Sequence, residues 1–217
     1  MDSQHYVPAL GYRCLTRYYD AVVGATTRER TFKNALIAQT GLQKGQRVLD
    51  LACGTGTLSI WIDQSLPELE VHGIDGDEDI LSIARRKAAK AGTRIRYAAA
   101  MSYDLPYPDA YFDRVVSSLF FHHLNPRDKV RTTAEIYRVL KPGGELHVAD
   151  WGKPANLAMR TLFFLVQVLD GFENTRENVE GRLVEVFHDA GLSNADESRS
   201  FYTMLGTLAL YSAARTA

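Results

Sequence analysis

The sequence has few cysteines and no marked excess of charge of either sign. Its 217 residues include only two cysteines, Cys14 and Cys53, so neither a disulfide framework nor a cysteine-based zinc site can form. Lysine and arginine together number 25, aspartate and glutamate 26, and the formal net charge is −1. Such a chain lacks the positive potential that binding to nucleic acid or an anionic membrane requires. These absences predict a cytoplasmic protein with no nucleic-acid partner.

Long apolar runs are also missing. The most apolar long segment, residues 157–169, contains Arg160 and Gln167 and is shorter than the roughly 20 residues that a bilayer span needs. Residues 1–10 are polar. They lack a basic stretch and are not followed by an apolar stretch, so they do not indicate a targeting signal. We therefore expect no stable membrane span, and a chain of this length predicts one domain.

The sequence does contain a regular alternation of strand-like and helix-like segments. Connections of helical length between successive strands favour parallel pairing with helices on both faces of a doubly wound sheet. Two further strands joined by a short connection through Gly206 are expected to pair antiparallel. The expected strands are 47–52, 70–75, 94–99, 113–119, 145–150, 197–203 and 207–213, and the expected helices are 27–39, 57–64, 77–91, 126–140, 155–170 and 179–190.

Polar residues and glycines gather where these strands end. Doubly wound sheets bind ligands beyond the carboxyl ends of their strands, at the point where the strand order reverses. In the loop after the first strand, Gly54 and Gly56 allow a ligand to approach the backbone, and the next helix offers free N–H groups. The residues placed at this edge are Asp50, Ala52, Gly54, Gly56, Asp75, Gly76, Met101, Ser102, Ser118, Leu119, His122, His123, Asp150 and Trp151.

Two carboxylates near the loop bear on which cofactor this edge would bind. Asp75, at the end of the second strand, can accept hydrogen bonds from both ribose hydroxyls of a nucleoside and would repel a 2′-phosphate. Asp50, at the end of the first strand, disfavours a diphosphate and favours a sulfonium or an ammonium, provided that it does not point into the sheet. The loop also lacks the third glycine of the dinucleotide fingerprint. S-adenosylmethionine is therefore favoured over NAD, and an NAD-dependent oxidoreductase is an alternative.

The same segments resemble the class I S-adenosylmethionine-dependent methyltransferases, and most nearly those of the ubiquinone/menaquinone-biosynthesis type. The matching segments are VLDLACGTGTLSI (48–60), HGIDGDEDIL (72–81), LPYPDAYFDRVVSSLFFHHL (105–124) and VLKPGGELHVADW (139–151). The resemblance implies a Rossmann-like α/β fold with a mostly parallel seven-stranded sheet whose last strand is antiparallel. It further implies S-adenosylmethionine as cofactor, S-adenosylhomocysteine as product and a small-molecule acceptor. Within a single domain we expect an N-terminal helical cap (1–44), the cofactor-binding core (45–152), a lid-like helical insertion after strand 5 (153–175) and a C-terminal part (176–217).

The resemblance also suggests roles for residues outside the glycine loop. In this family an aromatic residue of the N-terminal segment often lies over the cofactor, which points to Tyr19 as a binding and catalytic candidate. The insertion commonly covers the acceptor site, and here it carries Phe163 and Phe164 in an apolar run, which predicts a hydrophobic acceptor. The alternative is a helix that packs on the cap or on a partner subunit. Met101 departs from the family pattern, which often has an acidic or amide residue there. Adenine would therefore be hydrogen-bonded by the backbone and by Ser102.

Several residues keep two interpretations at this stage. His122 and His123 are candidates for a general base, because imidazole titrates near neutral pH, and packing or capping is the alternative for each. Asp150 and Trp151 either wall the pocket, with an orienting carboxylate, or simply end a strand. Arg28 either reaches the methionine carboxylate of the cofactor or lies on a solvated helix face.

Other predictions concern Cys53, assembly and function. Cys53 is expected to be a small buried loop residue, and no metal site is predicted. A homodimer is compatible with the sequence. A protein that binds the cofactor without transferring methyl is the alternative function.

Overall fold

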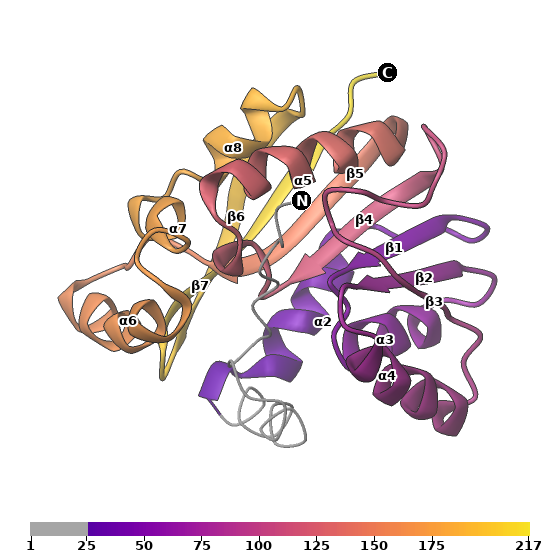
Figure 1. Cartoon of the computed structure of the whole chain (residues 1–217), viewed down its shortest axis with the longest axis horizontal. Coiled ribbons are helices and arrows are strands. Elements are labelled where there is room, and N and C mark those ends of the chain that lie inside the picture. Colours follow the sequence, from indigo (N-terminus) through magenta and orange to yellow (C-terminus); the bar gives the residue numbers. More distant parts are fainter. Residues whose placement is uncertain (1–25) are drawn as a thin grey trace, which may run out of the picture.

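The computed structural model describes residues 26–217 and is built around one seven-stranded sheet (Figure 1). The strand order is β3-β2-β1-β4-β5-β7-β6. Strand β7 is antiparallel to both of its neighbours, and the remaining pairs are parallel, which confirms the predicted sheet. The strands are β1 (Arg47–Leu51), β2 (Glu70–Asp75), β3 (Arg96–Ala99), β4 (Phe112–Ser118), β5 (Leu140–Trp151), β6 (Ser193–Thr203) and β7 (Gly206–Ala214).

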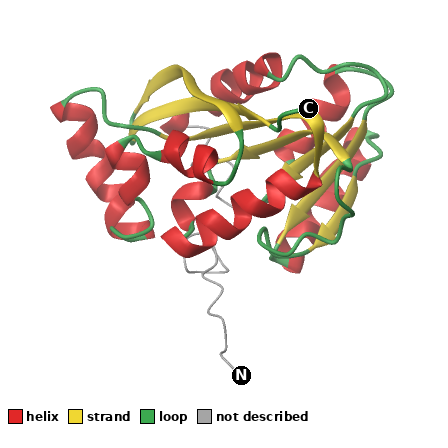
Figure 2. Cartoon of the chain, turned by 90° about the horizontal axis from the view of Figure 1, so that it is seen from above, coloured by secondary structure: helices red, strands yellow, loops and turns green. Residues whose placement is uncertain are grey.

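Helices cover both faces of the sheet (Figure 2). Helix α4 begins and ends at residues that its sequence favours: Asp77 caps it by accepting hydrogen bonds from two backbone N–H groups, and Gly92 ends it with a φ of 71°. No helix in the described part of the chain is long and apolar enough to cross a membrane. The helices are α2 (Glu29–Gln39), α3 (Thr57–Ser65), α4 (Glu78–Ala91), the 3-10 turn η1 (Phe121–His123), α5 (Pro126–Val139), α6 (Leu157–Asp170), α7 (Arg176–Glu180) and α8 (Leu183–Asp189).

Alternation along the strands builds one hydrophobic core on each face of the sheet. Leu49 and Leu51 of β1 pack into the core that α5 and α8 cover, whereas Val48 packs into the core under α2, α3 and α6. Because successive side chains of a strand point to opposite faces, a strand buried on both sides is mostly apolar. Adjacent buried apolar residues such as Val48-Leu49 in β1 and Val115-Val116 in β4 meet this requirement. Burying both faces also leaves only the strand ends accessible to a ligand.

The single helix expected at 179–190 is wrong. The structure has two helices there, α7 and α8, and Gly181 separates them with a φ of 74°. A left-handed residue of this kind ends a helix, and glycine adopts that conformation at little cost. The apolar periodicity continues across the break, so periodicity alone did not reveal it.

Strand β5 is longer at its start than expected. It begins at Leu140, immediately after α5, and runs through Pro142-Gly143-Gly144 instead of beginning at 145. Leu140 pairs with Phe112 of β4, and the C-terminal segment exchanges backbone hydrogen bonds with Gly143 and Gly144 through Arg215. Pairing on both sides makes this segment part of β5, and the turn that its composition indicates is reduced to an irregularity at Gly143, which has a φ of 78°.

The close packing of Gly73 against Tyr97 yields a test of the sheet beneath the glycine loop. A Cβ atom at Gly73 would lie 2.5 Å from the Tyr97 ring and 3.0 Å from the Cys53 sulfur. We expect Gly73→Ala to lower the free energy of unfolding by about 1–3 kcal/mol in urea titrations, because overpacking strains the sheet. In a Tyr97→Ala background the added methyl group has room, and its cost should largely disappear. An equal cost in both backgrounds would contradict this account.

Candidate functional site

The strand order reverses between β1 and β4, and the chain bends unusually where these two neighbouring strands end. Ala52 follows β1 with a φ of 56°, and Leu119 follows β4 with a φ of 55°. A left-handed conformation costs a non-glycine residue roughly 1–2 kcal/mol and is concentrated at functional sites. Both residues were predicted at the ligand edge, and the structure brings them together there.

The two glycines of the loop have different surroundings. Gly54, with a φ of 54°, has no atom of residues 26–217 within 4 Å of an added Cβ atom, so those residues leave its surface open to a ligand. Gly56, with a φ of 77°, stands at the start of α3, and a Cβ there would collide with the hydroxyl of Tyr97. Gly54 therefore offers close approach to the backbone, and Gly56 allows the loop to pack against β3. Cys53 is buried between them and the sheet, as predicted, and burial raises the pKa of its thiol.

Asp75 is held against the glycine loop by its own carboxylate. One oxygen accepts a hydrogen bond from the Gly54 N–H at 2.9 Å, and the other accepts one from the Asp77 N–H at 3.0 Å. Because Asp77 caps α4, Asp75 does not serve as the cap. Each carboxylate oxygen keeps a further lone pair for a ligand donor. Burial outweighs these hydrogen bonds and raises the pKa of Asp75 above its usual value.

Asp50 lies beneath the loop. Its side chain is buried, and one carboxylate oxygen accepts a hydrogen bond from the Ser59 hydroxyl of α3 at 2.5 Å. Burial raises the pKa of Asp50 to about 6, although Ser59 and the charge of Lys33 oppose the shift. Asp50 therefore contacts α3 through Ser59.

Lys87 of α4 forms hydrogen bonds to the glycine loop, and the sequence did not predict this contact. Its ammonium donates hydrogen bonds to the hydroxyl oxygens of Thr55 at 2.9 Å and Thr57 at 2.7 Å. In the sequence Lys87 is one of several basic residues on an amphipathic helix, with nothing to distinguish it. The loop is thus fixed by β2 through Asp75 and by α4 through Lys87.

In the described part of the chain, the other residues predicted to contact the cofactor differ in their surroundings. The Ser118 hydroxyl is buried at the end of β4 and has no hydrogen-bond partner among residues 26–217. The Ser102 hydroxyl is within 2.7 Å of the Thr132 hydroxyl of α5, so it anchors its loop to that helix. Met101 and Gly76 are partly or fully exposed, and Arg28 is exposed at the start of α2. Tyr19 lies outside the described residues.

The buried carboxylate of Asp150 organises the end of β5. It accepts hydrogen bonds from the backbone N–H groups of Phe120 at 3.0 Å and Trp151 at 2.6 Å, and one of its oxygens is 2.7 Å from His122 Nδ1. Of the two interpretations left open for Asp150, this geometry supports the orienting carboxylate. Asp150 orients His122 and does not itself line open space.

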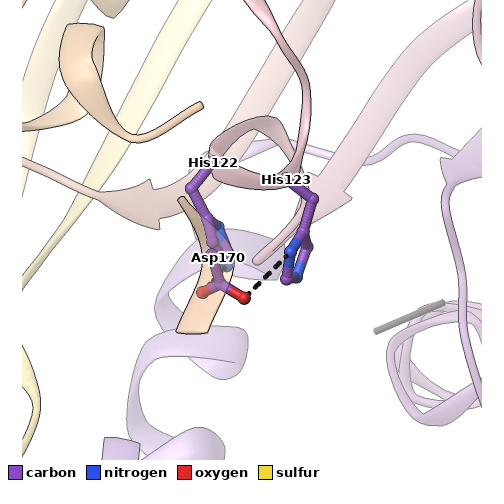
Figure 3. Close-up of side chains that lie close together, drawn as sticks. All are labelled: His122, His123 and Asp170. Carbon is purple, nitrogen blue, oxygen red and sulfur yellow. Dashed lines mark ion pairs between the residues drawn. The ribbon is translucent and has the colours of Figure 1, made fainter. Parts of the chain in front are cut away.

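Asp170, at the last position of α6, joins the two histidines, and sequence reasoning missed it. Figure 3 shows both imidazoles projecting from the η1 turn toward this carboxylate. One Asp170 oxygen is 3.4 Å from His123 Nδ1, the other is 3.7 Å from His122 Nε2, and the imidazole centroids are 4.0 Å apart. The donor atoms of the three residues lie within 4.8 Å of one another, so a divalent ion could also enter this arrangement.

The two histidines differ in their electrostatic surroundings. Burial would lower the pKa of His122, but the charges of Asp150 and Asp170 outweigh burial and raise it. Burial lowers the pKa of His123, and the positive charge of His122 lowers it further. These surroundings favour the protonated form of His122 and the neutral form of His123.

Phe163 and Phe164, which were expected to cover the acceptor together, lie on different faces of α6. Phe163 is buried in the core and packs against Trp151, with ring centroids 5.5 Å apart. Phe164 is 53% exposed and contacts Phe172. Successive residues of a helix point about 100° apart, so adjacent aromatics cannot share one face. Trp151, which also contacts the His122 ring, is buried as well.

Comparison with known proteins places this geometry in a family. A family model described as a methyltransferase domain matches residues 48–144. A demethylmenaquinone methyltransferase of Symbiobacterium thermophilum is 30% identical over 97% of this chain and 92% of its own length. One from Thermus thermophilus is 41% identical over 50% of this chain, and the alignment spans about half (49%) of that relative. A ubiquinone/menaquinone biosynthesis C-methyltransferase of Francisella philomiragia is 31% identical over 77% of this chain and 74% of its own length.

Solved structures agree in fold. An S-adenosylmethionine-dependent methyltransferase of Aquifex aeolicus superposes with a TM-score of 0.67 at 20% identity, over 94% of this chain and 98% of that one. A Haemonchus contortus phosphoethanolamine N-methyltransferase in complex with S-adenosylmethionine gives 0.75 at 17% identity, over 97% of this chain and 59% of that one. The chain therefore belongs to the class I S-adenosylmethionine-dependent methyltransferases, as its motifs predicted.

The burial of Asp50 makes stability depend on pH. A carboxyl whose folded-state pKa is raised to about 6 stabilises the fold while it is protonated, and this contribution is lost as pH rises from about 4 through 6. We expect the stability of the wild type relative to Asp50→Asn to fall by about 1.5 kcal/mol between pH 5 and pH 8 in urea titrations. A pH-independent difference for Asp50→Asn would refute the assignment.

Proposed function

We propose that the protein transfers the methyl group of S-adenosylmethionine to a small hydrophobic acceptor. The observation that carries this proposal is the Asp75 carboxylate held 2.9 Å from the Gly54 N–H, beside a loop surface that is open to a ligand. This arrangement offers ribose acceptors next to a backbone that a nucleoside can approach closely. The net negative charge contributed by Asp50 and Asp75 favours a cationic nucleoside over one that carries a diphosphate.

The proposed pose follows from the positions of the strand ends. The ribose hydroxyls would donate to Asp75, and the adenine would pack near Met101 and receive its hydrogen bonds from the backbone. The ammonium and sulfonium would lie toward the field of Asp50. A bound cation there favours the ionised carboxylate and would therefore lower the raised pKa of Asp50. Ser118, a buried hydroxyl at the same edge, would be available to the methionine part.

Two findings support a hydrophobic acceptor. Helix α6, beside the histidine pair, exposes apolar side chains that include Phe164 at 53%, Leu165 at 55% and Val168 at 55%. Such a face suits an apolar ligand better than a charged one. The relatives named above as demethylmenaquinone methyltransferases make demethylmenaquinone the first acceptor to try.

The chemistry needs little from the protein beyond alignment. The sulfonium already activates the methyl carbon, so holding the acceptor atom in line at about 3 Å in a dry crevice supplies most of the acceleration. A base is required where the acceptor must lose a proton. We propose that the histidine pair at the end of β4 provides it.

A calorimetric titration with S-adenosylmethionine and with S-adenosylhomocysteine tests cofactor binding, and absence of binding for both at millimolar concentration would end the proposal. Incubation with oxidised and with reduced demethylmenaquinone, followed by mass spectrometry, tests transfer through the mass gain of one CH₂ group. The alternative function, cofactor binding without transfer, would show calorimetric binding but no methylated product with these acceptors or with a panel of hydrophobic metabolites.

Asp75 and its neighbour Asp77 allow a matched test of the ribose contact. We expect Asp75→Ala to weaken binding of S-adenosylhomocysteine by about 1.5–3 kcal/mol, or roughly 10- to 150-fold, because charged hydrogen bonds to the ribose are lost. Asp77→Ala removes the cap of α4, so it should lower stability by about 1 kcal/mol and leave the affinity unchanged. Equal affinities of the Asp75→Ala variant and the wild type would remove Asp75 from the site.

A further inference from the structure

We propose that His123 is the general base of the transfer reaction, that Asp170 at the end of α6 is the residue that positions it, and that His122 is a fixed cation beside it. This inference deepens the proposed function and rests on it. It chooses between two histidines that the sequence could not tell apart, and it gives a role to a carboxylate that no motif indicated.

The geometry around His122 leaves it no nitrogen with which to accept a substrate proton. Its Nδ1 is 2.7 Å from Asp150 and its Nε2 is 3.7 Å from Asp170, so a carboxylate faces each side of the ring. Its side chain is also only 4% exposed. An imidazole between two carboxylates is stabilised as the doubly protonated cation, which has donors on both nitrogens and no lone pair.

His123 has the complementary arrangement. Its Nδ1 faces Asp170 at 3.4 Å, and its side chain is 27% exposed, the more accessible of the two. If Nδ1–H donates to Asp170, the lone pair of the neutral ring is on Nε2, the nitrogen on the far side from the carboxylate. The distance of 3.4 Å is long for a hydrogen bond, and such catalytic contacts often shorten only when substrate binds.

The closeness of the two rings prevents both from carrying a charge. Their centroids are 4.0 Å apart, and two imidazolium cations at that distance in a buried site repel strongly. Because Asp150 and Asp170 both face His122, the charge settles there and His123 stays neutral. The fixed cation thereby keeps the base in the form that accepts a proton.

A network of buried polar groups holds Asp170 in place. The Asn174 amide donates to the backbone carbonyl of His123 at 3.2 Å and to that of Asp170 at 3.0 Å, so it joins the two segments directly. Lys129, fully buried on α5, donates to the Asn174 carbonyl and to the Glu177 carboxylate. Breaking a buried ion pair leaves an uncompensated charge and is strongly destabilising, so these contacts hold the segment that follows Asp170 in place.

The proton balance of the reaction requires a base of this kind. An acceptor hydroxyl loses its proton to His123 Nε2, the acceptor forms a bond to the methyl carbon, and the sulfur–carbon bond breaks. The sulfur keeps the electron pair, and S-adenosylhomocysteine leaves. One proton is released whether oxygen or a conjugated carbon is methylated, and it passes from His123 to solvent.

Nitrogen NMR of protein labelled in its histidine rings tests the assignment without any acceptor. Signals are assigned with the His122→Asn and His123→Asn variants, in the presence and absence of S-adenosylhomocysteine. At pH 7 we expect His122 to be doubly protonated and His123 to be neutral, with its proton on Nδ1. A charged His123, or one that carries its proton on Nε2, would overturn the proposal even if methyl transfer were established.

Kinetics with the acceptor that gives product in the assay above supply the second test. We expect His123→Gln to lower kcat by about 10²- to 10⁴-fold and Asp170→Asn by roughly tenfold or more, with affinity for S-adenosylhomocysteine within about twofold of wild type. Glu173→Gln, at an exposed acid just beyond α6, is the matched control and should keep wild-type kcat. Unchanged kcat in His123→Gln would overturn the proposal.

The pH profile separates positioning from mere structural support. The groups that face His123 are His122 from η1, Asp170 from α6 and Asp150 from β5, and Lys129 of α5 acts on His122. The Asp170 charge raises the pKa of His123, in opposition to burial, so the Asp170→Asn substitution should lower that pKa. As the pH is decreased, kcat of the variant should therefore begin to fall at a lower pH than kcat of the wild type. An unshifted acidic limb would contradict the positioning role.

Activity lost on treatment with EDTA and restored by Zn²⁺ would show instead that the three residues hold a metal.

Discussion

The hydrogen bond between the Gly54 N–H and the Asp75 carboxylate is the interaction on which the rest of the site depends. It joins the loop after β1 to the end of β2, and these two strands are neighbours in the sheet. The loop must leave the strand through a left-handed residue at Ala52, and such a bend persists only where surrounding contacts hold it. Asp75 provides one of those contacts and Lys87 provides others through Thr55 and Thr57. The same carboxylate that fixes the loop thus lies at the carboxyl end of β2, the edge of the sheet where a ligand is expected.

A second buried carboxylate, Asp150, joins neighbouring strand ends in the same way as Asp75. It joins the end of β5 to the backbone after β4 at Phe120 and to the His122 ring. Burial raises the pKa of Asp75. Burial would also raise the pKa of Asp150, but the charge of His122 and the hydrogen bonds from His122 and the Trp151 N–H together outweigh it and hold that pKa below its usual value. Asp75, which has no charged partner, therefore lies where a cationic ligand would supply the missing positive charge. Asp150 already has a charged partner in His122, and it fixes the orientation of that side chain.

The sequence was sufficient for the sheet and for the loop because both depend on local signals. Apolar runs, glycines and the capping residue Asp77 lie within a few positions of the structure that they specify, and the family motifs cover the same segments. The contacts that sequence reasoning missed join distant segments: Asp170 meets His123 only because α6 folds back over η1, and Lys129 meets Glu177 at a separation of 48 residues. Asp170 belongs to none of the motifs, and its only local signal is that the helix dipole disfavours an acidic residue in the last turn of a helix. The break at Gly181 was missed for the opposite reason, because the apolar periodicity continued through it.

The position of Asp170 links acceptor binding to catalysis. The helix that exposes the apolar side chains of Phe164 and Val168 is the same helix that ends in the carboxylate facing His123. An apolar acceptor that packs against α6 would therefore press on the element that holds the base, and an α6 displaced by even an ångström would leave His123 without its partner. Asn174 and Lys129 resist that displacement, because moving α6 away from η1 would leave buried donors unpaired. Selection of the acceptor and orientation of the base are thus properties of one helix, and substitutions on its apolar face are expected to alter both together.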